Sequence, residues 1–141
     1  PGLDSKVGKV RMNGKEVFKH AVEKLSSSLI EVIKDANLNI NDIDYLIPHQ
    51  ANNRIIDSLS KKLKFPKDKI INTVDIHANT SAASIPLALC YAVDKKIVKN
   101  GDVIALNAIG GGLSWGASII KYGKPNWRPF FFCINVINRR F

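Results

Sequence analysis

Tyr45-Leu46-Ile47-Pro48-His49-Gln50-Ala51-Asn52 joins a short apolar strand to the start of an amphipathic helix. A second segment of this kind, His77-Ala78-Asn79-Thr80-Ser81-Ala82-Ala83-Ser84, precedes another apolar helix. Each segment places a polar side chain, His49 or Asn79, between a strand and a helix, where functional groups of α/β folds usually lie. The two segments predict an α/β fold whose candidate site includes His49 and Asn79.

Hydrophobic periodicity on either side of these segments predicts alternating helices and strands. We expect helices at 15–36, 51–63 and 80–93 and strands at 9–12, 45–48, 70–74, 103–107 and 113–122. This alternation favours a mixed, mostly parallel sheet covered by helices. The periodicity ends after Tyr122, so we expect one domain over 1–122 and a tail over 123–141, with Phe130-Phe131-Phe132, outside the fold.

Length and charge narrow the possible functions. The 141 residues suffice for one compact domain or half of a larger one, and the start at Pro1 suggests a piece of a longer protein. No apolar run approaches the ~20 residues that span a bilayer. The net charge of +9 predicts attraction to an acidic partner, although a lysine-rich coding bias explains it equally well. No nucleic-acid-binding motif occurs, so we expect neither a nucleic-acid nor a membrane partner.

The two cysteines form neither a disulfide framework nor a metal-ligand spacing. Cys90 lies in the apolar run 87–91, where we expect a small buried side chain rather than a thiolate. Cys133 lies in the expected tail. Neither cysteine qualifies as a nucleophile, and we expect no metal site.

Each candidate residue also has a purely structural explanation. His49 could hydrogen-bond a nearby carbonyl, Asn79 could cap the following helix, and Gly110-Gly111-Gly112 could form a tight turn between strands. His77 is expected to be structural. Together, however, an imidazole and a carboxamide can both donate hydrogen bonds to one oxygen that gains negative charge, as in an oxyanion site. A glycine turn could serve a second such oxygen, a combination that suits thioester chemistry.

Several motifs resemble β-ketoacyl-acyl-carrier-protein synthase III. Ile47-Pro48-His49-Gln50-Ala51-Asn52 is similar to the histidine motif of that family, and residues 79–86 are similar to its asparagine motif. Residues 110–116 resemble the closing glycine turn, and residues 12–18 resemble the segment that opens the C-terminal half. The resemblance covers roughly residues 8–122 in order and spacing.

The resemblance implies a thiolase-like fold, in which two similar halves form a five-layer αβαβα sandwich, and a homodimer. It also implies an acyltransferase that starts type II fatty acid synthesis by decarboxylative Claisen condensation of an acyl-coenzyme A primer with malonyl-acyl carrier protein. The catalytic set would be Cys-His-Asn, with His49 and Asn79 supplied here and the cysteine by the N-terminal half. This chain alone should therefore not form an acyl-enzyme.

Further residues take implied roles from the same resemblance. The Gly111 amide would contribute to the oxyanion hole, and Asn52 would contact the pantetheine arm. Arg54 would lie near the carrier-protein docking surface. Lys61 and Lys62 share its helix, so this basic face is expected to attract an acidic carrier protein, unless it is simply a solvated face. The thioesters are substrates, and no cofactor is implied.

Two other functions stay open. The chain could be a non-catalytic half that binds carrier protein or pairs with another half. It could also belong to a sister condensing enzyme that makes polyketides or 3-hydroxy-3-methylglutaryl-CoA. The family occurs in bacterial cytoplasm and in plastids, so either compartment is expected. The primer acyl chain stays open, because much of its pocket would lie in the other half.

Overall fold

The structure, a computed structural model, describes residues 13–123 and 132–140, the latter as backbone only. The elements in chain order are α1 (Gly14–Asp35), η1 (Ile40–Asp42), β1 (Tyr45–Pro48), α2 (Asn53–Leu63), η2 (Lys67–Lys69), α3 (Val74–His77), η3 (Ser81–Ala83), α4 (Ser84–Asp94), β2 (Val103–Gly110), β3 (Ser114–Lys121) and β4 (Phe132–Arg140). The expected strand at 9–12 lies outside the described residues.

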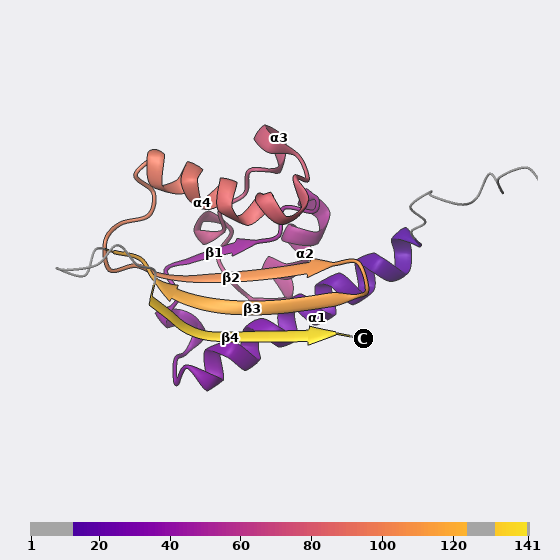
Figure 1. The fold of residues 1–141 in the computed structure, drawn as a ribbon, viewed down its shortest axis with the longest axis horizontal. Helices are drawn as coiled ribbons and strands as arrows, with labels where there is room; N and C mark the ends of the chain where they lie inside the picture. The colour runs from indigo at the N-terminus through magenta and orange to yellow at the C-terminus, as the bar shows by residue number, and fades with distance from the viewer. Residues whose placement is uncertain (1–12, 124–131, 141) are drawn as a thin grey trace, which may run out of the picture.

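A four-stranded sheet in the order β1-β2-β3-β4 forms the centre of the fold (Figure 1). β1 pairs with β2 in parallel, and β2 with β3 and β3 with β4 pair antiparallel. The sheet is therefore mixed, and one of its three described strand pairs is parallel. The parallel pair positions the site, because its register places Pro48 opposite Asn107 and brings the ends of both strands to one edge.

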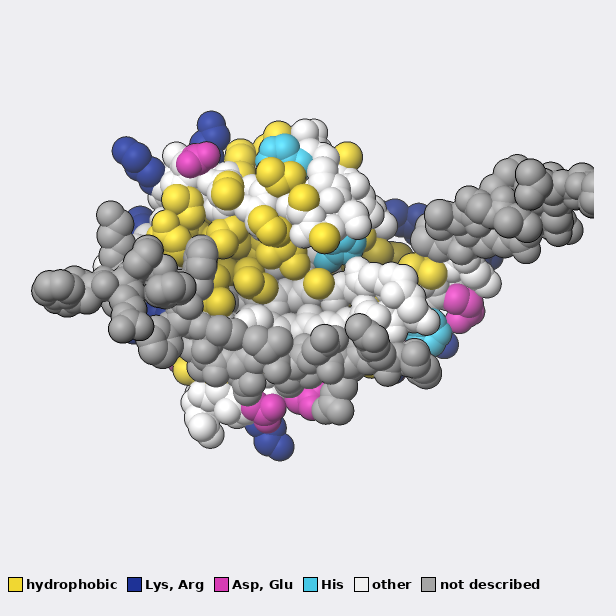
Figure 2. Space-filling model, viewed as in Figure 1, with side chains coloured by type: hydrophobic (Ala, Val, Ile, Leu, Met, Phe, Trp, Pro, Cys, Tyr) yellow, Lys and Arg dark blue, Asp and Glu magenta, His cyan; other side chains and the backbone are white. Residues whose placement is uncertain are grey.

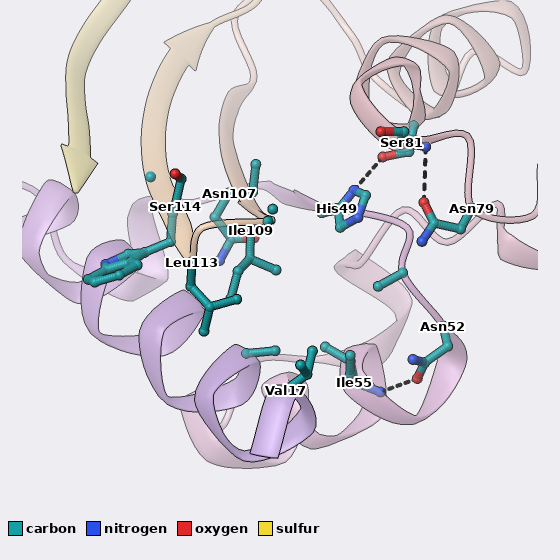
Figure 3. A pocket seen from close by; sticks show the side chains of 18 of the residues that line it. Val17, His49, Asn52, Ile55, Asn79, Ser81, Asn107, Ile109, Leu113 and Ser114 are labelled. Carbon is teal, nitrogen blue, oxygen red and sulfur yellow. Dashed lines mark hydrogen bonds between the residues drawn. The ribbon is translucent and has the colours of Figure 1, made fainter. Parts of the chain in front are cut away.

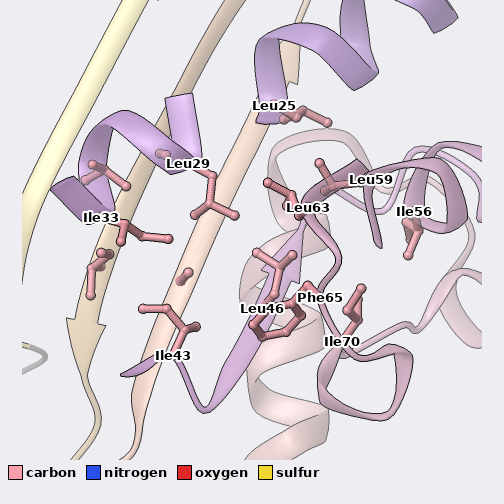
Figure 4. Close-up of a cluster of buried hydrophobic side chains, with 14 of the residues drawn as sticks. Leu25, Leu29, Ile33, Ile43, Leu46, Ile56, Leu59, Leu63, Phe65 and Ile70 are labelled. Atoms are coloured by element: carbon pink, nitrogen blue, oxygen red, sulfur yellow. The ribbon is translucent and has the colours of Figure 1, made fainter. Parts of the chain in front are cut away.

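Alternating side chains of the strands build two separate cores. Leu46 and Ala105 face α1 and α2, where they join a cluster that includes Leu25, Leu29 and Leu59 (Figure 4). Their neighbours Ile47 and Ile104 face the other side and pack with α4. This two-residue period gives three layers, with α1 and α2 on one face of the sheet and α4 on the other.

The expected strand at 70–74 is wrong. Only an isolated parallel bridge joins Leu46 to Ile70, and Val74 begins the four-residue helix α3 instead. Two backbone N–H groups of this segment bond to side chains instead of to a neighbouring strand. Gln50 Oε1 accepts the Thr73 N–H at 2.7 Å, and Asn72 Oδ1 accepts the Val74 N–H at 3.0 Å. Such local bonds compete with sheet formation.

β4 lies within the segment expected outside the fold. Its backbone pairs with β3 from Phe132 opposite Lys121 to Arg140 opposite Ser114, with an irregularity between Ile119 and Ile120. Part of the segment thus extends the sheet at its edge. Phe130 and Phe131 lie outside the described residues, and the domain division at residue 122 stays a prediction.

Candidate functional site

An open cavity lies where β1 and β2 end. Its walls come from the first turns of α1 and α2, the segment from Asn79 to Ile85, and the turn between β2 and β3. His49, Asn52, Asn79 and Gly111 all line it, so the structure brings together four residues that the sequence predicted for the site (Figure 3).

His49 occupies the floor of the cavity directly after β1. Its backbone N–H donates to Asn107 O at 2.7 Å, which continues the pairing of β1 with β2 by one residue. Its ring Nδ1 lies 2.7 Å from the hydroxyl of Ser84 at the start of α4. Burial lowers the pKa of the His49 imidazole from its usual 6.5, because a charged ring would lose hydration. The ring is therefore neutral at neutral pH.

Gln50 fixes the backbone on which His49 sits, a role that the sequence did not reveal. The side chain is 1% exposed, and its amide nitrogen donates to Pro48 O at 2.7 Å and Ile71 O at 3.2 Å. Its oxygen accepts from the Thr73 N–H. Every polar atom of this buried side chain has a partner, so Gln50 ties the end of β1 to the 71–73 segment.

Asn79 lies beside His49 on an exposed rim of the cavity (Figure 3). Its side-chain oxygen accepts the Ser81 N–H at 3.0 Å, an Asx turn rather than a cap of α4. This bond leaves the amide nitrogen as the group that can donate to a ligand. The preceding residue, Ala78, has φ 55° and ψ −159°, a conformation that is essentially restricted to glycine.

The glycine turn between β2 and β3 also lines the cavity. Gly112 has φ +138°, and a Cβ there would approach Ser114 Oγ to 2.9 Å and Ser114 N to 3.1 Å. Gly110 and Gly111 are exposed with open space around them. The turn therefore brings backbone without side chains to the cavity, and Gly111 lies in its lining.

Asn52 has a structural role that the sequence analysis did not assign. Its side-chain oxygen accepts the Ile55 N–H at 2.9 Å and caps α2. The amide nitrogen stays available at the cavity wall. Asn52 can therefore both hold the helix and donate a hydrogen bond to a ligand.

The basic face of α2 is exposed. Arg54 and Lys61, seven residues apart, lie on one side of the helix, about 10 Å apart along its axis, and Lys62 is exposed in the last turn. The Arg54 guanidinium stacks over the Phe18 ring of α1 with 5.6 Å to the ring centroid. This contact holds the charged group at the mouth of the cavity.

The expectation that Cys90 is buried is wrong, because Cys90 is exposed on α4. The buried stripe of α4 consists of Ser84, Ala88 and Ala92, small residues that let the helix approach the sheet closely. Cys90 and Leu87 point away from this stripe. Figure 2 shows apolar side chains gathered over this part of the surface, where Ile76 and Leu87 are 56% and 37% exposed.

The cysteine and the histidine that the sequence did not assign to the site lie outside its lining. Neither Cys90 nor His77 is among the residues that line the cavity. Within 13–123 and 132–140, no group of three or more His, Cys, Asp or Glu side chains is placed to hold a metal ion. In the same described part, no helix is both long and apolar enough to cross a membrane.

Comparison with known proteins gives one consistent result. A family model described as 3-oxoacyl-[acyl-carrier-protein (ACP)] synthase III C terminal matches residues 33–122. A curated relative from Wolbachia pipientis subsp. Culex pipiens, named beta-ketoacyl-[acyl-carrier-protein] synthase III, is 60% identical over 115 residues, which cover 82% of this chain and 36% of the relative. A relative of that name from Sphingopyxis alaskensis is 53% identical, covering 86% of this chain and 38% of the relative.

Solved structures of the same family share the fold. The beta-ketoacyl-[acyl carrier protein] synthase III of Thermus thermophilus has a TM-score of 0.78 at 44% identity, covering 80% of this chain and 35% of that one. The 3-oxoacyl-[acyl-carrier-protein] synthase III of Aquifex aeolicus has a TM-score of 0.80 at 44% identity, covering 84% of this chain and 38% of that one. The fold is thus thiolase-like, and this chain spans somewhat over a third of the relatives it matches.

Proposed function

Because the chain belongs to the 3-oxoacyl-[acyl-carrier-protein] synthase III family, through its C-terminal part, we propose that it supplies the His and Asn of a condensing-enzyme site. In the proposed reaction, an acyl group passes from acyl-coenzyme A to a cysteine outside this chain. Malonyl-acyl carrier protein then loses CO2, and the resulting enolate carbon attacks the acyl-enzyme. The new carbon–carbon bond forms as the cysteine thiolate leaves.

His49 and Asn79 stabilise the enolate in this proposal. The observation that carries it is their placement side by side at the cavity, one as a neutral imidazole and the other with its amide oxygen already bonded to Ser81. Both groups are therefore available as hydrogen-bond donors. Two donors aimed at the malonyl thioester oxygen favour the state in which that oxygen becomes negative.

The Gly111 amide serves the second oxyanion, which forms when the enolate adds to the acyl-enzyme. The turn is exposed to the cavity, and the Gly112 conformation brings its backbone around without a side chain. A backbone N–H placed in this way needs no rearrangement during the reaction.

The nucleophile comes from outside the chain in this proposal. Cys90 is exposed on α4 and does not line the cavity. We therefore expect the chain alone to form no acyl-enzyme. The apolar surface around Ile76 and Leu87 is where the cysteine-bearing half would pack, and the complete protein would be a homodimer.

The carrier protein docks on the basic face of α2. Arg54 lies at the cavity, and Lys61 lies about two turns further along the same side of the helix. Asn52 then donates its free amide N–H to the pantetheine arm. Asn52→Asp separates the two roles of this residue, because a carboxylate keeps the helix cap but cannot donate.

The proposal involves thioester substrates and no cofactor. The relatives named above come from bacteria, which favours bacterial cytoplasm over a plastid as the proposed compartment.

The test uses the gene product at its natural length, assayed for condensation of acetyl-coenzyme A with malonyl-acyl carrier protein. His49→Ala and Asn79→Ala should each lower kcat by about 10²–10³, the usual cost of deleting an oxyanion donor. His77→Ala serves as the matched control, because His77 does not line the cavity, and should retain activity. Turnover that survives the double replacement at 49 and 79 would exclude the assigned roles.

A polyketide-type condensing enzyme is the second candidate. A structure titled as the priming beta-ketosynthase from the R1128 polyketide biosynthetic pathway has a TM-score of 0.76 at 34% identity to this chain. Comparing carrier proteins of fatty acid and polyketide synthesis as malonyl donors separates the two. A preference for the polyketide carrier protein would favour this second candidate.

A further inference from the structure

The His49 ring has one partner among the described residues, the hydroxyl of Ser84. Ser84 is 2% exposed, opens α4, and places Oγ 2.7 Å from His49 Nδ1. The same oxygen accepts the backbone N–H of Gln50 at 3.3 Å. Ser84 thus contacts both the catalytic ring and the backbone of the next residue.

The hydrogen-bond inventory of Ser84 fixes the direction of the bond to His49. A serine hydroxyl has one proton to donate and two lone pairs to accept with. The Gln50 N–H can only donate, so it occupies one lone pair. Within the described residues, His49 Nδ1 is the one acceptor that the structure provides for the hydroxyl proton. If Nδ1 carried a proton, the buried hydroxyl proton would have no partner, which is costly.

We propose that Ser84 is a positioning residue that holds His49 as the Nε2–H tautomer by donating its hydroxyl proton to Nδ1. This inference rests on the proposed function, in which His49 must donate a hydrogen bond to the thioester oxygen. With Nδ1 occupied, Nε2 carries the proton and is the donor. The other tautomer would present a lone pair to that oxygen and repel the enolate.

The surroundings of His49 keep the ring neutral, as this role requires. Burial lowers the pKa of the imidazole. The charged side chains among the described residues that line the cavity are Lys15 at the start of α1 and Arg54 at the start of α2. Both are cations, which oppose protonation of His49. The 79–84 segment and β2 contribute no ionisable side chain to the lining.

Ser84 also couples the two catalytic side chains. Asn79 and Ser84 lie at the two ends of one short segment. Asn79 forms the Asx turn at its start, and Ser84 is the first residue of α4 at its end. Because Ser84 is buried against the sheet, its bond to His49 fixes the distance between that segment and the end of β1. The tautomer and the placement of Asn79 thus depend on the same contact.

The first test measures the tautomer in the unmodified protein and does not depend on activity. Nitrogen-15 NMR of the natural-length protein reports which nitrogen of each imidazole carries the proton, and the signals that disappear in His49→Gln are those of His49. We expect His49 to show a protonated Nε2 and an unprotonated, hydrogen-bonded Nδ1 at neutral pH. Observation of the Nδ1–H tautomer would overturn the proposal.

Variants then test the contribution of the hydroxyl. Ser84→Ala should yield a mixture of His49 tautomers, lower kcat for malonyl decarboxylation about 10-fold or more with little change in KM, and move the acid limb of the pH–rate profile to higher pH. Ser84→Thr retains the hydroxyl and should restore the tautomer. Ser60→Ala is the matched control, because it removes the hydrogen bond of another buried serine, to Phe65 O at 2.8 Å, at a position outside the cavity lining.

An unchanged tautomer and unchanged kcat in Ser84→Ala would also overturn the proposal. If Ser84→Ala does not fold, the tautomer measured in the unmodified protein decides the question. A protein without condensing activity but with the Nε2–H tautomer would refute the proposed function and leave the tautomer assignment standing.

Discussion

Ala78, which precedes Asn79, has a backbone conformation that is unfavourable for alanine. Its φ of 55° with ψ of −159° crowds the Cβ, and such residues cost roughly 1–3 kcal/mol. Glycine removes the crowding but adds about 0.4–1 kcal/mol of unfolded-chain entropy. Ala78→Gly should therefore raise the free energy of unfolding by about 1 kcal/mol, measured by urea denaturation.

Ala88→Gly is the control for this prediction. Ala88 is fully buried inside α4, where glycine loses both packing and helix propensity and should lower stability by about 1 kcal/mol or more. A lower stability of Ala78→Gly would show that residue 78 is unstrained.

Single residues also show where sequence reasoning reached its limit. His49, Asn79, Asn52 and Gly111 could be predicted because short motifs carry them, and all four line one cavity. The supporting roles of Gln50 and Ser84 could not. Apart from the bond of Gln50 to Pro48, their side-chain partners lie 21–35 residues away along the chain, and no local pattern encodes such bonds.

The turn between β2 and β3 requires glycine at position 112. Gly112 combines a positive φ with a close approach to Ser114, so Gly112→Ala forces both strain and a shift of backbone. We expect the free energy of unfolding to fall by roughly 1–3 kcal/mol. Thermal denaturation of the purified variant measures the loss.

Gly101→Ala isolates the contribution of the close contact. Gly101 also has a positive φ, of +100°, but no atom lies within 4 Å of a Cβ placed there. The loss should therefore be smaller than for Gly112→Ala. Equal losses would mean that φ alone, and not the approach of Ser114, sets the requirement at the turn.

Some helices and strands could be predicted from the hydrophobic pattern of the sequence and others could not, for physical reasons. α1, β1 and α2 follow their hydrophobic period and begin or end within two residues of the expected bounds. The strand expected at 70–74 fails because Gln50 and Asn72 bond its backbone, and Cys90 is exposed because α4 packs through its small residues. Apolar composition alone does not tell which face of a helix contacts the sheet.

At the scale of the whole molecule, stability should depend on the protonation of His49. Its pKa is lower in the folded protein than the usual 6.5. As the pH falls below about 6.5, the unfolded chain binds this proton before the folded chain does. The contribution of His49 to stability is thus complete above that pH and is lost as the pH falls through the folded pKa.

Urea unfolding at about pH 8 and about pH 5 measures this dependence. His49→Gln, which cannot titrate, should lose less stability between the two conditions than the unmodified protein. His20→Gln is the comparison variant, because His20 lies on α1 and is not in the cavity lining. An equal pH dependence in the unmodified protein and His49→Gln would refute the prediction.

The exposed thiol of Cys90 can be used to measure chemically whether the apolar surface of α4 is covered. With Cys133 replaced by serine, the rate of alkylation by a maleimide would measure how accessible Cys90 on α4 is to the reagent. Addition in trans of the cysteine-bearing half proposed above would slow the reaction if that half covers α4. If the proposed two halves assemble in this way, the loss of Cys90 reactivity would follow their association.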